Sequence, residues 1–263
     1  MLHDDRLSPE DFARVSALAQ QETGIQLPPS KRVMLEGRLR RCARDAGATS
    51  LSSWCAGVLS SGRGGSEWRR LIDAVTTNKT DFMREPAHFE LLRTRIVPEL
   101  LRGRARRLKV WSAACSTGAE PWSIAMTLGD LKQDGAQEFD FAILGTDISE
   151  QALRRAAQGI YPSQETAPVA PLTANRWLRR GRSGDMAGQV RIAAELRRRV
   201  SFARINLMDD RYPVDDDVDV IFLRNVLIYF DRETQGRVIG RLLRHLRPGG
   251  CLLLGHAEPY VGP

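Results

Sequence analysis

Two patterns of apolar residues divide the chain. In the N-terminal part, apolar positions such as Phe12 and Val15 recur at helical spacing, which predicts amphipathic helices. Prolines and glycines interrupt this pattern and split it into several helices, the last two around residues 50–60 and 66–75. We therefore predict that residues 1–75 form a small all-helical domain.

After residue 105 the pattern changes to short apolar runs separated by helical stretches. The apolar runs are Leu108–Trp111, Phe139–Leu144, Val218–Leu223 and Cys251–Leu254. The helical stretches lie near residues 119–133, 150–157 and 232–246. Strands that alternate with helices are typical of parallel βαβ units. The sequence therefore predicts an α/β domain with a doubly wound parallel sheet.

Two further segments fit neither pattern. Residues 160–198 begin with a proline-containing stretch and include a strand-like run at Val190–Ile192, so we interpret them as an inserted subdomain. Residues 76–90 lie between the helical part and the sheet, and we interpret them as a linker. The sheet domain with its insertion then covers residues 91–263.

The composition is that of a globular protein with a basic surface. Of the 263 residues, 42% are apolar and 27% are charged, and the formal net charge is +7. Part of the excess lies between Lys31 and Arg44, where six basic residues stand against one acid, Glu36. An anionic partner is therefore expected, which could be a nucleic acid, a membrane surface or an acidic protein.

The cysteines and the N-terminus indicate the compartment. Cys42, Cys55, Cys115 and Cys251 lie far apart and show no metal-ligand spacing, so we interpret them as reduced thiols and expect no metal site. The N-terminal residues lack the apolar core of a signal peptide, and no apolar run approaches the roughly 20 residues that span a bilayer. We therefore predict a cytoplasmic protein without membrane insertion.

Small residues follow the first predicted strand. Trp111–Pro121 reads WSAACSTGAEP, and small side chains let the backbone approach a ligand at the carboxyl edge of a parallel sheet. The GxGxxG pattern is missing here, which argues against a nicotinamide dinucleotide. Asp147 ends the second predicted strand, where a carboxylate can bind both hydroxyls of a ribose. The alternative is that Asp147 caps the helix that follows it.

Two other polar segments are candidates for a ligand site. Arg224 and Asn225 follow the buried run Val218–Leu223, so they are expected at the same edge of the sheet. Thr76–Glu85 reads TTNKTDFMRE and lies between the two domains. Taken alone, the first segment could be a loop that caps a helix, and the second could be a plain linker.

Six segments together resemble one protein family. In chain order they are TTNKTDFMRE, WSAACSTGAEPWSIA, GTDIS, INL at Ile205–Leu207, LRNVLIYFD and LRPGGCLLLGHAE. Their order and spacing are similar to those of the CheR family of chemotaxis receptor methyltransferases, over nearly the whole chain. The resemblance implies a small N-terminal helical domain, a Rossmann-like S-adenosylmethionine-dependent methyltransferase domain and an inserted antiparallel β-subdomain.

The resemblance also implies a bound S-adenosylmethionine cofactor and the residues around it. Glu120 matches the acid that binds the methionine amino group, and Asp147 matches the acid that binds the ribose hydroxyls. Asn78, Thr80 and Arg84 match positions that close over the cofactor. Asn206 and Leu207 match positions beside its adenine, and Arg224 and Asn225 match positions near its centre.

The reaction implied by the resemblance is methyl transfer to glutamate side chains, giving glutamate methyl esters and S-adenosylhomocysteine. Arg84 and Tyr229 match the pair that orients the acceptor carboxylate. A glutamate carboxylate is ionised at neutral pH, because its reference pKa is about 4.3, so no general base is needed. We therefore interpret His256 as structural. The family usually reads HSE at this place, whereas this chain reads His256-Ala257-Glu258.

The implied partner is the cytoplasmic helical region of chemotaxis receptors, which is rich in Glu and Gln. The basic helix is expected to bind this region through Arg32, Arg38, Arg41 and Arg44. The alternative is a solvated basic face without a partner. The resemblance leaves open whether the β-subdomain binds a receptor's C-terminal peptide and whether a further module follows Pro263. We expect a monomer that binds no nucleic acid.

Two other functions stay open on the sequence alone. The positive charge would suit a methyltransferase for RNA, although the chain lacks the interleaved aromatic and basic residues of single-strand binding surfaces. A regulatory protein that binds the cofactor without catalysis would not need Arg84 and Tyr229.

Overall fold

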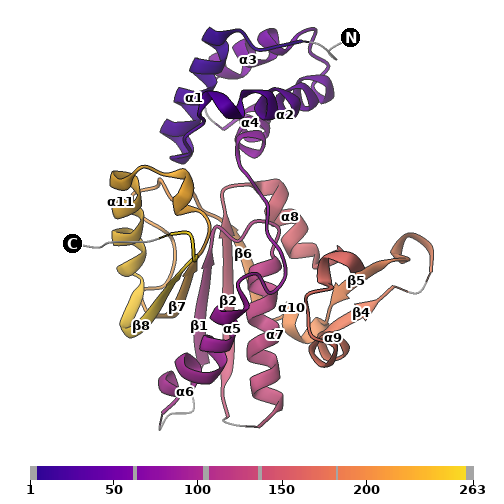
Figure 1. Ribbon diagram of the computed structural model, residues 1–263, viewed down its shortest axis with the longest axis vertical. Coiled ribbons are helices and arrows are strands. Elements are labelled where there is room, and N and C mark those ends of the chain that lie inside the picture. The colour runs from indigo at the N-terminus through magenta and orange to yellow at the C-terminus, as the bar shows by residue number, and fades with distance from the viewer. Residues whose placement is uncertain (1–4, 62–63, 103–106, 136–137, 182, 259–263) are drawn as a thin grey trace.

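The chain folds into a helical domain and a larger α/β domain joined by an extended linker (Figure 1). The computed structural model describes residues 5–61, 64–102, 107–135, 138–181 and 183–258. Within these residues it confirms the predicted fold class, with a helical N-terminal region, a parallel sheet and an inserted antiparallel sheet. No helix among them is both long and apolar enough to cross a bilayer.

The helical domain is a bundle with its own apolar core. Its helices are α1 (Pro9–Thr23), α2 (Arg32–Asp45), α3 (Leu51–Ser60) and α4 (Ser66–Val75), with a 3₁₀ turn at Pro29–Lys31. Ser8 caps α1 by accepting a hydrogen bond from the Asp11 N–H. Leu35 and Leu39 of α2 are fully buried against Trp54 and its neighbours. The buried positions therefore follow the helical spacing of apolar residues.

The α/β domain is built on five parallel strands in the order β6-β2-β1-β7-β8. The strands are β1 (Arg107–Ala113), β2 (Asp140–Asp147), β6 (Val200–Arg204), β7 (Val218–Leu223) and β8 (Leu246–Leu254). The helices around them are α5 (Pro86–Leu91), α6 (Val97–Leu100), α7 (Ala119–Gln133), α8 (Glu150–Gln158) and α11 (Arg232–Leu243). A π-helical turn at Leu92–Ile96 joins α5 to α6, and a 3₁₀ turn spans Leu227–Tyr229. Every residue of β7 is buried, and all but Asp219 are apolar, as expected of a strand covered on both faces.

The central strand β1 pairs with β2 on one side and with β7 on the other. The strand order therefore reverses at β1, because β2 and β6 are added on one side and β7 and β8 on the other. In open α/β sheets such a point forms a crevice outside the carboxyl ends of the strands. The turn after β1 is strained, because Ala114 and Ser116 have φ angles of 61° and 53°. Gly118 has a φ of 91°, and a Cβ atom there would lie 2.7 Å from that of Ala156. Glycine is therefore required at this close approach.

The insertion forms a second, antiparallel sheet in the order β3-β5-β4. Its elements are β3 (Ile160–Pro162), α9 (Pro171–Trp177), β4 (Leu178–Arg180), β5 (Gln189–Ile192) and α10 (Ala194–Arg197), with 3₁₀ turns at Ser163–Thr166 and Gly184–Met186. Arg182 of the insertion lies outside the described residues. Figure 1 shows that this sheet projects to one side of the main sheet, beyond α7.

The helical domain packs directly on the carboxyl edge of the main sheet. Gly24 ends α1 in a left-handed conformation with a φ of 72°, and a Cβ atom there would lie 2.8 Å from the Met208 sulfur. The Asn206 amide donates to the Glu22 carbonyl at 2.6 Å, and the Gln26 N–H donates to the Tyr229 carbonyl at 3.0 Å. The end of α1 is thus joined to two loops of the sheet domain.

Candidate active site

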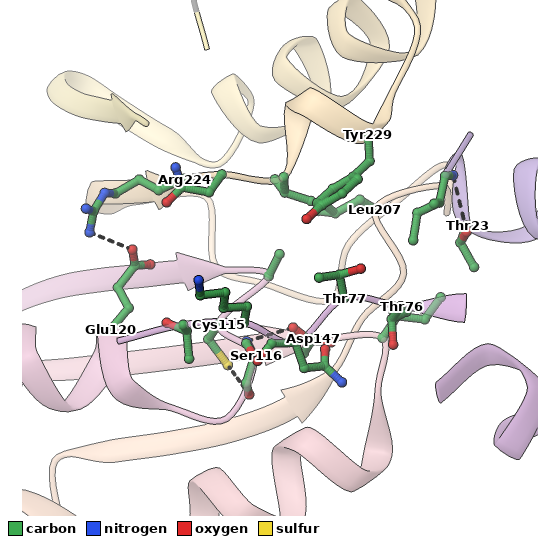
Figure 2. Close-up of a pocket in the computed structure, with 18 of the residues that line it drawn as sticks. Thr23, Thr76, Thr77, Cys115, Ser116, Glu120, Asp147, Leu207, Arg224 and Tyr229 are labelled. Atoms are coloured by element: carbon green, nitrogen blue, oxygen red, sulfur yellow. Dashed lines mark hydrogen bonds and ion pairs between the residues drawn. The ribbon is translucent and has the colours of Figure 1, made fainter. Parts of the chain in front are cut away.

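A cavity lies where the linker, the end of α1 and the carboxyl edge of the sheet meet (Figure 2). It contains about 930 Å³ of empty space, part of it open to solvent. The cavity is lined by every residue that the sequence assigned to the cofactor or to catalysis: Asn78, Thr80, Arg84, Glu120, Asp147, Asn206, Leu207, Arg224, Asn225 and Tyr229. These residues come from five separate parts of the chain, and the fold brings them around one space.

Asp147 is held at the end of β2 by backbone donors. Its Oδ2 accepts a hydrogen bond from the Ser116 N–H at 2.7 Å, and its Oδ1 accepts one from the Ser149 N–H at 2.9 Å. Burial raises the pKa of the carboxyl, and these hydrogen bonds oppose the shift. The N-cap of α8 is Ser149, whose side chain accepts a hydrogen bond from the Ala152 N–H. Ser149, and not Asp147, therefore caps this helix. Each carboxylate oxygen of Asp147 keeps acceptor capacity for a ligand in the cavity.

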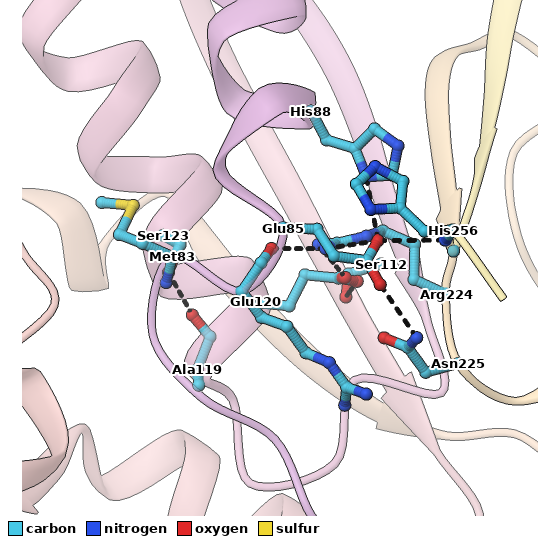
Figure 3. A network of polar contacts seen from close by, with 12 residues as sticks. Met83, Glu85, His88, Ser112, Ala119, Glu120, Ser123, Arg224, Asn225 and His256 are labelled. Carbon is cyan, nitrogen blue, oxygen red and sulfur yellow. Dashed lines mark hydrogen bonds and ion pairs between the residues drawn. The ribbon is translucent and has the colours of Figure 1, made fainter.

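Glu120 and Arg224 form a buried ion pair at the other side of the cavity (Figures 2 and 3). Arg224 Nη1 lies 2.9 Å from Glu120 Oε2, and the Ser112 hydroxyl donates to Glu120 Oε1 at 2.7 Å. Burial raises the pKa of Glu120 overall, and the interactions with Arg224 and Ser112 oppose this shift. A buried carboxylate that is paired in this way is stabilised as an anion and can accept from an ammonium group.

A second carboxylate, Glu85 of the linker, holds Arg224 from the opposite side (Figure 3). Glu85 accepts hydrogen bonds from Arg224 Nη2 at 3.1 Å and from the Asn225 amide at 3.0 Å, and Arg224 also donates to the Arg84 carbonyl. Burial acts to raise the pKa of Glu85, but the hydrogen bonds from Asn225 and Arg224 lower it overall. Arg224 therefore fixes the linker to the edge of the sheet.

Arg84 and Tyr229 line the cavity from two different segments. Arg84 belongs to the linker, and its guanidinium donates to the Lys79 carbonyl at 3.3 Å. Tyr229 ends the 3₁₀ turn after β7 and points into the cavity from the wall opposite Asp147 (Figure 2). Because a guanidinium carries five N–H donors, Arg84 keeps donors for a carboxylate.

Several residues around the cavity were missed by the sequence analysis. Ser112 and Ser116 orient the two acids, while Thr23 and Ile25 add a wall from α1. The most informative is Glu258, a buried carboxylate that accepts three backbone N–H groups, those of Asn225, Leu227 and Gly255, at 2.6–2.8 Å. Its place in the LGHAE segment was a signal, but its contacts cannot be derived from spacing.

Replacing Glu258 with glutamine is expected to lower turnover about tenfold, because an amide loses one of the acceptors that hold the loop before Tyr229. Methyl-transfer kinetics and thermal unfolding should be measured together. Asp219→Asn is the matched control, since Asp219 is equally buried and accepts the Lys109 N–H at 2.7 Å at the opposite end of β7. Equal turnover losses in both variants would mean that Glu258 serves stability alone.

The structure divides the four arginines assigned to receptor binding. Arg32 pairs with Glu36 and donates to the Leu7 carbonyl, and Arg38 donates to the Ala74 and Thr76 carbonyls at the end of α4. Arg41 and Arg44 are exposed, and their side chains pair with no other described residue. Arg32 and Arg38 thus have a role inside the helical domain, whereas Arg41 and Arg44 are available to a partner.

Comparison with known protein families distinguishes between the functions considered for this cavity. The profile described as "CheR methyltransferase, SAM binding domain" matches residues 78–262, and "CheR methyltransferase, all-alpha domain" matches residues 10–76. The chain belongs to the CheR methyltransferase family.

Curated relatives match this CheR chain over nearly its whole length. A chemotaxis protein methyltransferase of Escherichia coli K12 is 39% identical over 254 residues, which cover 97% of this chain and 86% of the relative. Chemotaxis protein methyltransferase 2 of Pseudomonas aeruginosa PAO1 is 38% identical, with 96% and 87% covered. A chemotaxis protein methyltransferase of Borreliella burgdorferi is 30% identical, with 97% and 90% covered.

The cavity of this CheR chain suits the family's cofactor, S-adenosylmethionine. Its donor set offers one buried carboxylate for an ammonium group, a second for a pair of hydroxyls, and guanidinium groups for a carboxylate. The strained turn after β1, with small residues at Ala114 and Ser116, lets the backbone come close to a ligand. The residues present therefore fit the group in charge and in hydrogen-bonding capacity.

Proposed function

We propose that this chain methylates glutamate side chains of chemotaxis receptors, giving glutamate methyl esters and S-adenosylhomocysteine. The observation that carries the proposal is one cavity that combines the cofactor's donor set with Arg84 and Tyr229. Relatives that match nearly the whole chain are named chemotaxis protein methyltransferases, which supports this choice of substrate.

The residues of the cavity supply alignment rather than proton transfer. When bound, the cofactor supplies an electrophilic methyl group. The Arg84 guanidinium and the Tyr229 hydroxyl would hold the acceptor carboxylate with one oxygen directed into the cavity, which raises the rate by orientation. The carboxylate is ionised at neutral pH and needs no base. His88 and His256 are not among the residues that line the cavity.

A basic groove beside the cavity supports a receptor helix as the acceptor. Its four arginines come from α2, α4 and α8 and are Arg38, Arg41, Arg70 and Arg154. Two acids, Asp45 and Asp73, also line the groove. Thr76 and Asn78 line both the groove and the cavity, so the two lie side by side. A helix rich in Glu has the opposite charge and could present one glutamate to the cavity while others face the groove.

The proposal is tested by transfer of a radiolabelled methyl group from S-adenosylmethionine to receptor-containing membranes. We expect labelled receptor whose label is released by mild base, because carboxyl esters hydrolyse under these conditions. Incubation with RNA is the parallel assay. Label that enters RNA, or that stays on protein after base treatment, would contradict a glutamate ester.

Reversing the two exposed arginines of α2, by Arg41→Glu and Arg44→Glu together, is expected to raise KM for receptor several-fold at low salt. Exposed pairs are each worth less than about 1 kcal/mol and are screened by salt, so the difference should shrink as ionic strength rises. Affinity for S-adenosylhomocysteine should not change, since neither residue lines the cavity.

The control for this test makes an equal change of net charge at the other end of the molecule. Arg95→Glu with Arg102→Glu alters two exposed arginines near α6, far from α2 (Figure 1). We expect this control to keep the wild-type KM. An equal rise in KM for both double variants would mean that overall charge, and not the α2 surface, attracts the receptor.

Whether a receptor peptide binds at the β-subdomain stays open. In the described sheet β5 lies between β3 and β4, so the outer side of β4 carries backbone groups that could pair with an extended peptide.

A further inference from the structure

Three side chains with metal-binding atoms converge beside the cavity, outside the residues assigned to the cofactor. A carboxylate oxygen of Glu85 and one ring nitrogen each of His88 and His256 all lie within 4.8 Å of one another. Figure 3 shows the two imidazole rings lying together above Glu85, which in turn contacts Arg224. Glu85 and His88 come from the start of α5, whereas His256 follows β8.

His88 has a polar atom that the rest of the described protein leaves unexplained. Its Nδ1 is buried and makes no hydrogen bond with any described residue, although Glu85 Oε2 lies 3.4 Å away. Buried polar atoms are nearly always paired, and an unpaired one costs about 1–3 kcal/mol. Burial lowers the pKa of His88, and the positive charge of Arg224 lowers it further.

The set of ligands indicates the class of metal. Two imidazoles and one carboxylate suit zinc and neighbouring first-row transition metals, whereas magnesium and calcium prefer oxygen ligands. Ligand atoms about 2 Å from zinc lie about 3–3.5 Å from one another, so the cluster must contract slightly. His256 is exposed and can make this movement. Two carboxylates, Glu85 and Glu120, flank Arg224, which limits its repulsion of a metal ion.

We propose that Glu85, His88 and His256 bind a transition-metal ion of the zinc class, and that this ion opposes cofactor binding. Both oxygens of Glu85 already accept from the sheet domain, from Arg224 and from Asn225. A metal ion would compete for this carboxylate and would also repel the Arg224 guanidinium. Since Arg224 and Asn225 line the cavity, metal and cofactor would each weaken the binding of the other by the same factor.

The binding test is a titration of the tag-free protein with Co²⁺, followed by displacement with Zn²⁺. We expect the visible absorption of four- or five-coordinate cobalt in the wild type. His256→Ala and His88→Ala should lower the affinity for zinc at least tenfold. The matched control is Glu90→Gln, which removes an exposed acid of α5 that pairs with Arg93. The weak spectrum of hydrated cobalt, or equal zinc affinity in His256→Ala and wild type, would overturn the site.

The coupling test is calorimetric titration with S-adenosylhomocysteine, with and without Zn²⁺. We expect zinc to weaken binding at least about fivefold in the wild type and not at all in His256→Ala. Without zinc both proteins should bind equally, because His256 does not line the cavity. An unchanged wild-type affinity at saturating zinc would overturn the antagonism. The proposed antagonism rests on the cavity being the cofactor site. Neither measurement requires a methyl acceptor, so a failure of the metal proposal can be distinguished from a failure of the receptor proposal.

Discussion

Replacing Asp147 with alanine is expected to weaken binding of S-adenosylhomocysteine by about 30- to 150-fold, or about 2–3 kcal/mol. The variant loses a charged acceptor for the ribose hydroxyls. It also leaves the Ser116 and Ser149 N–H groups without the carboxylate that now accepts from them, at 2.7 and 2.9 Å. Calorimetric titration measures the loss directly.

Asp147→Asn separates the two effects. The amide oxygen can keep one of the two backbone hydrogen bonds, so the turn after β1 should be disturbed less, but the charge is lost. We expect an affinity between those of the wild type and the alanine variant. A folded Asp147→Ala protein with wild-type affinity would remove Asp147 from the cofactor site.

Replacing Tyr229 with phenylalanine is expected to lower kcat about tenfold or more and to change cofactor affinity much less. The hydroxyl points into the cavity, where the acceptor carboxylate would lie, and one misplaced orienting contact costs more in the transition state than in binding. The aromatic ring remains, so the packing of the loop should be preserved. Initial rates on receptor membranes and calorimetry with S-adenosylhomocysteine give the two quantities.

Tyr161→Phe is the matched control for the loss of a tyrosine hydroxyl. Tyr161 is buried and donates to the Thr117 carbonyl at 2.7 Å, behind the turn after β1, and it does not line the cavity. We expect it to lower stability while kcat stays close to wild type. A Tyr229→Phe enzyme with wild-type kcat would end the role assigned to this residue.

Local patterns predicted most of the fold because they report local causes. The run Val218–Leu223 matches β7 residue for residue, since a strand buried on both faces is mostly apolar, here at every position except Asp219. The helix predicted at 119–133 matches α7. The end of α11 was predicted at residue 246 but lies at Leu243, because the apolar pattern continues into β8 without a break.

The candidate site was predicted less evenly. Asp147 and Glu120 could be chosen because strand ends and motif matches place them at the sheet edge, and both line the cavity. Arg32 and Arg38 looked like free charges, because sequence spacing cannot show that a carbonyl at Leu7 or Thr76 accepts from them. Long, flexible arginines find partners that only the packed domain supplies.

The sequence by itself determined the class of fold, the order of its parts and the family, because periodicity, caps and motifs are properties of neighbouring residues. The tertiary structure alone decided which charges meet. Glu85 reaches Arg224, and His88 reaches His256, across more than half of the chain, and Glu258 holds the loop before Tyr229 from a neighbouring strand end. Such contacts depend on how strands are ordered in the sheet, and strand order is set by the packing of the whole domain.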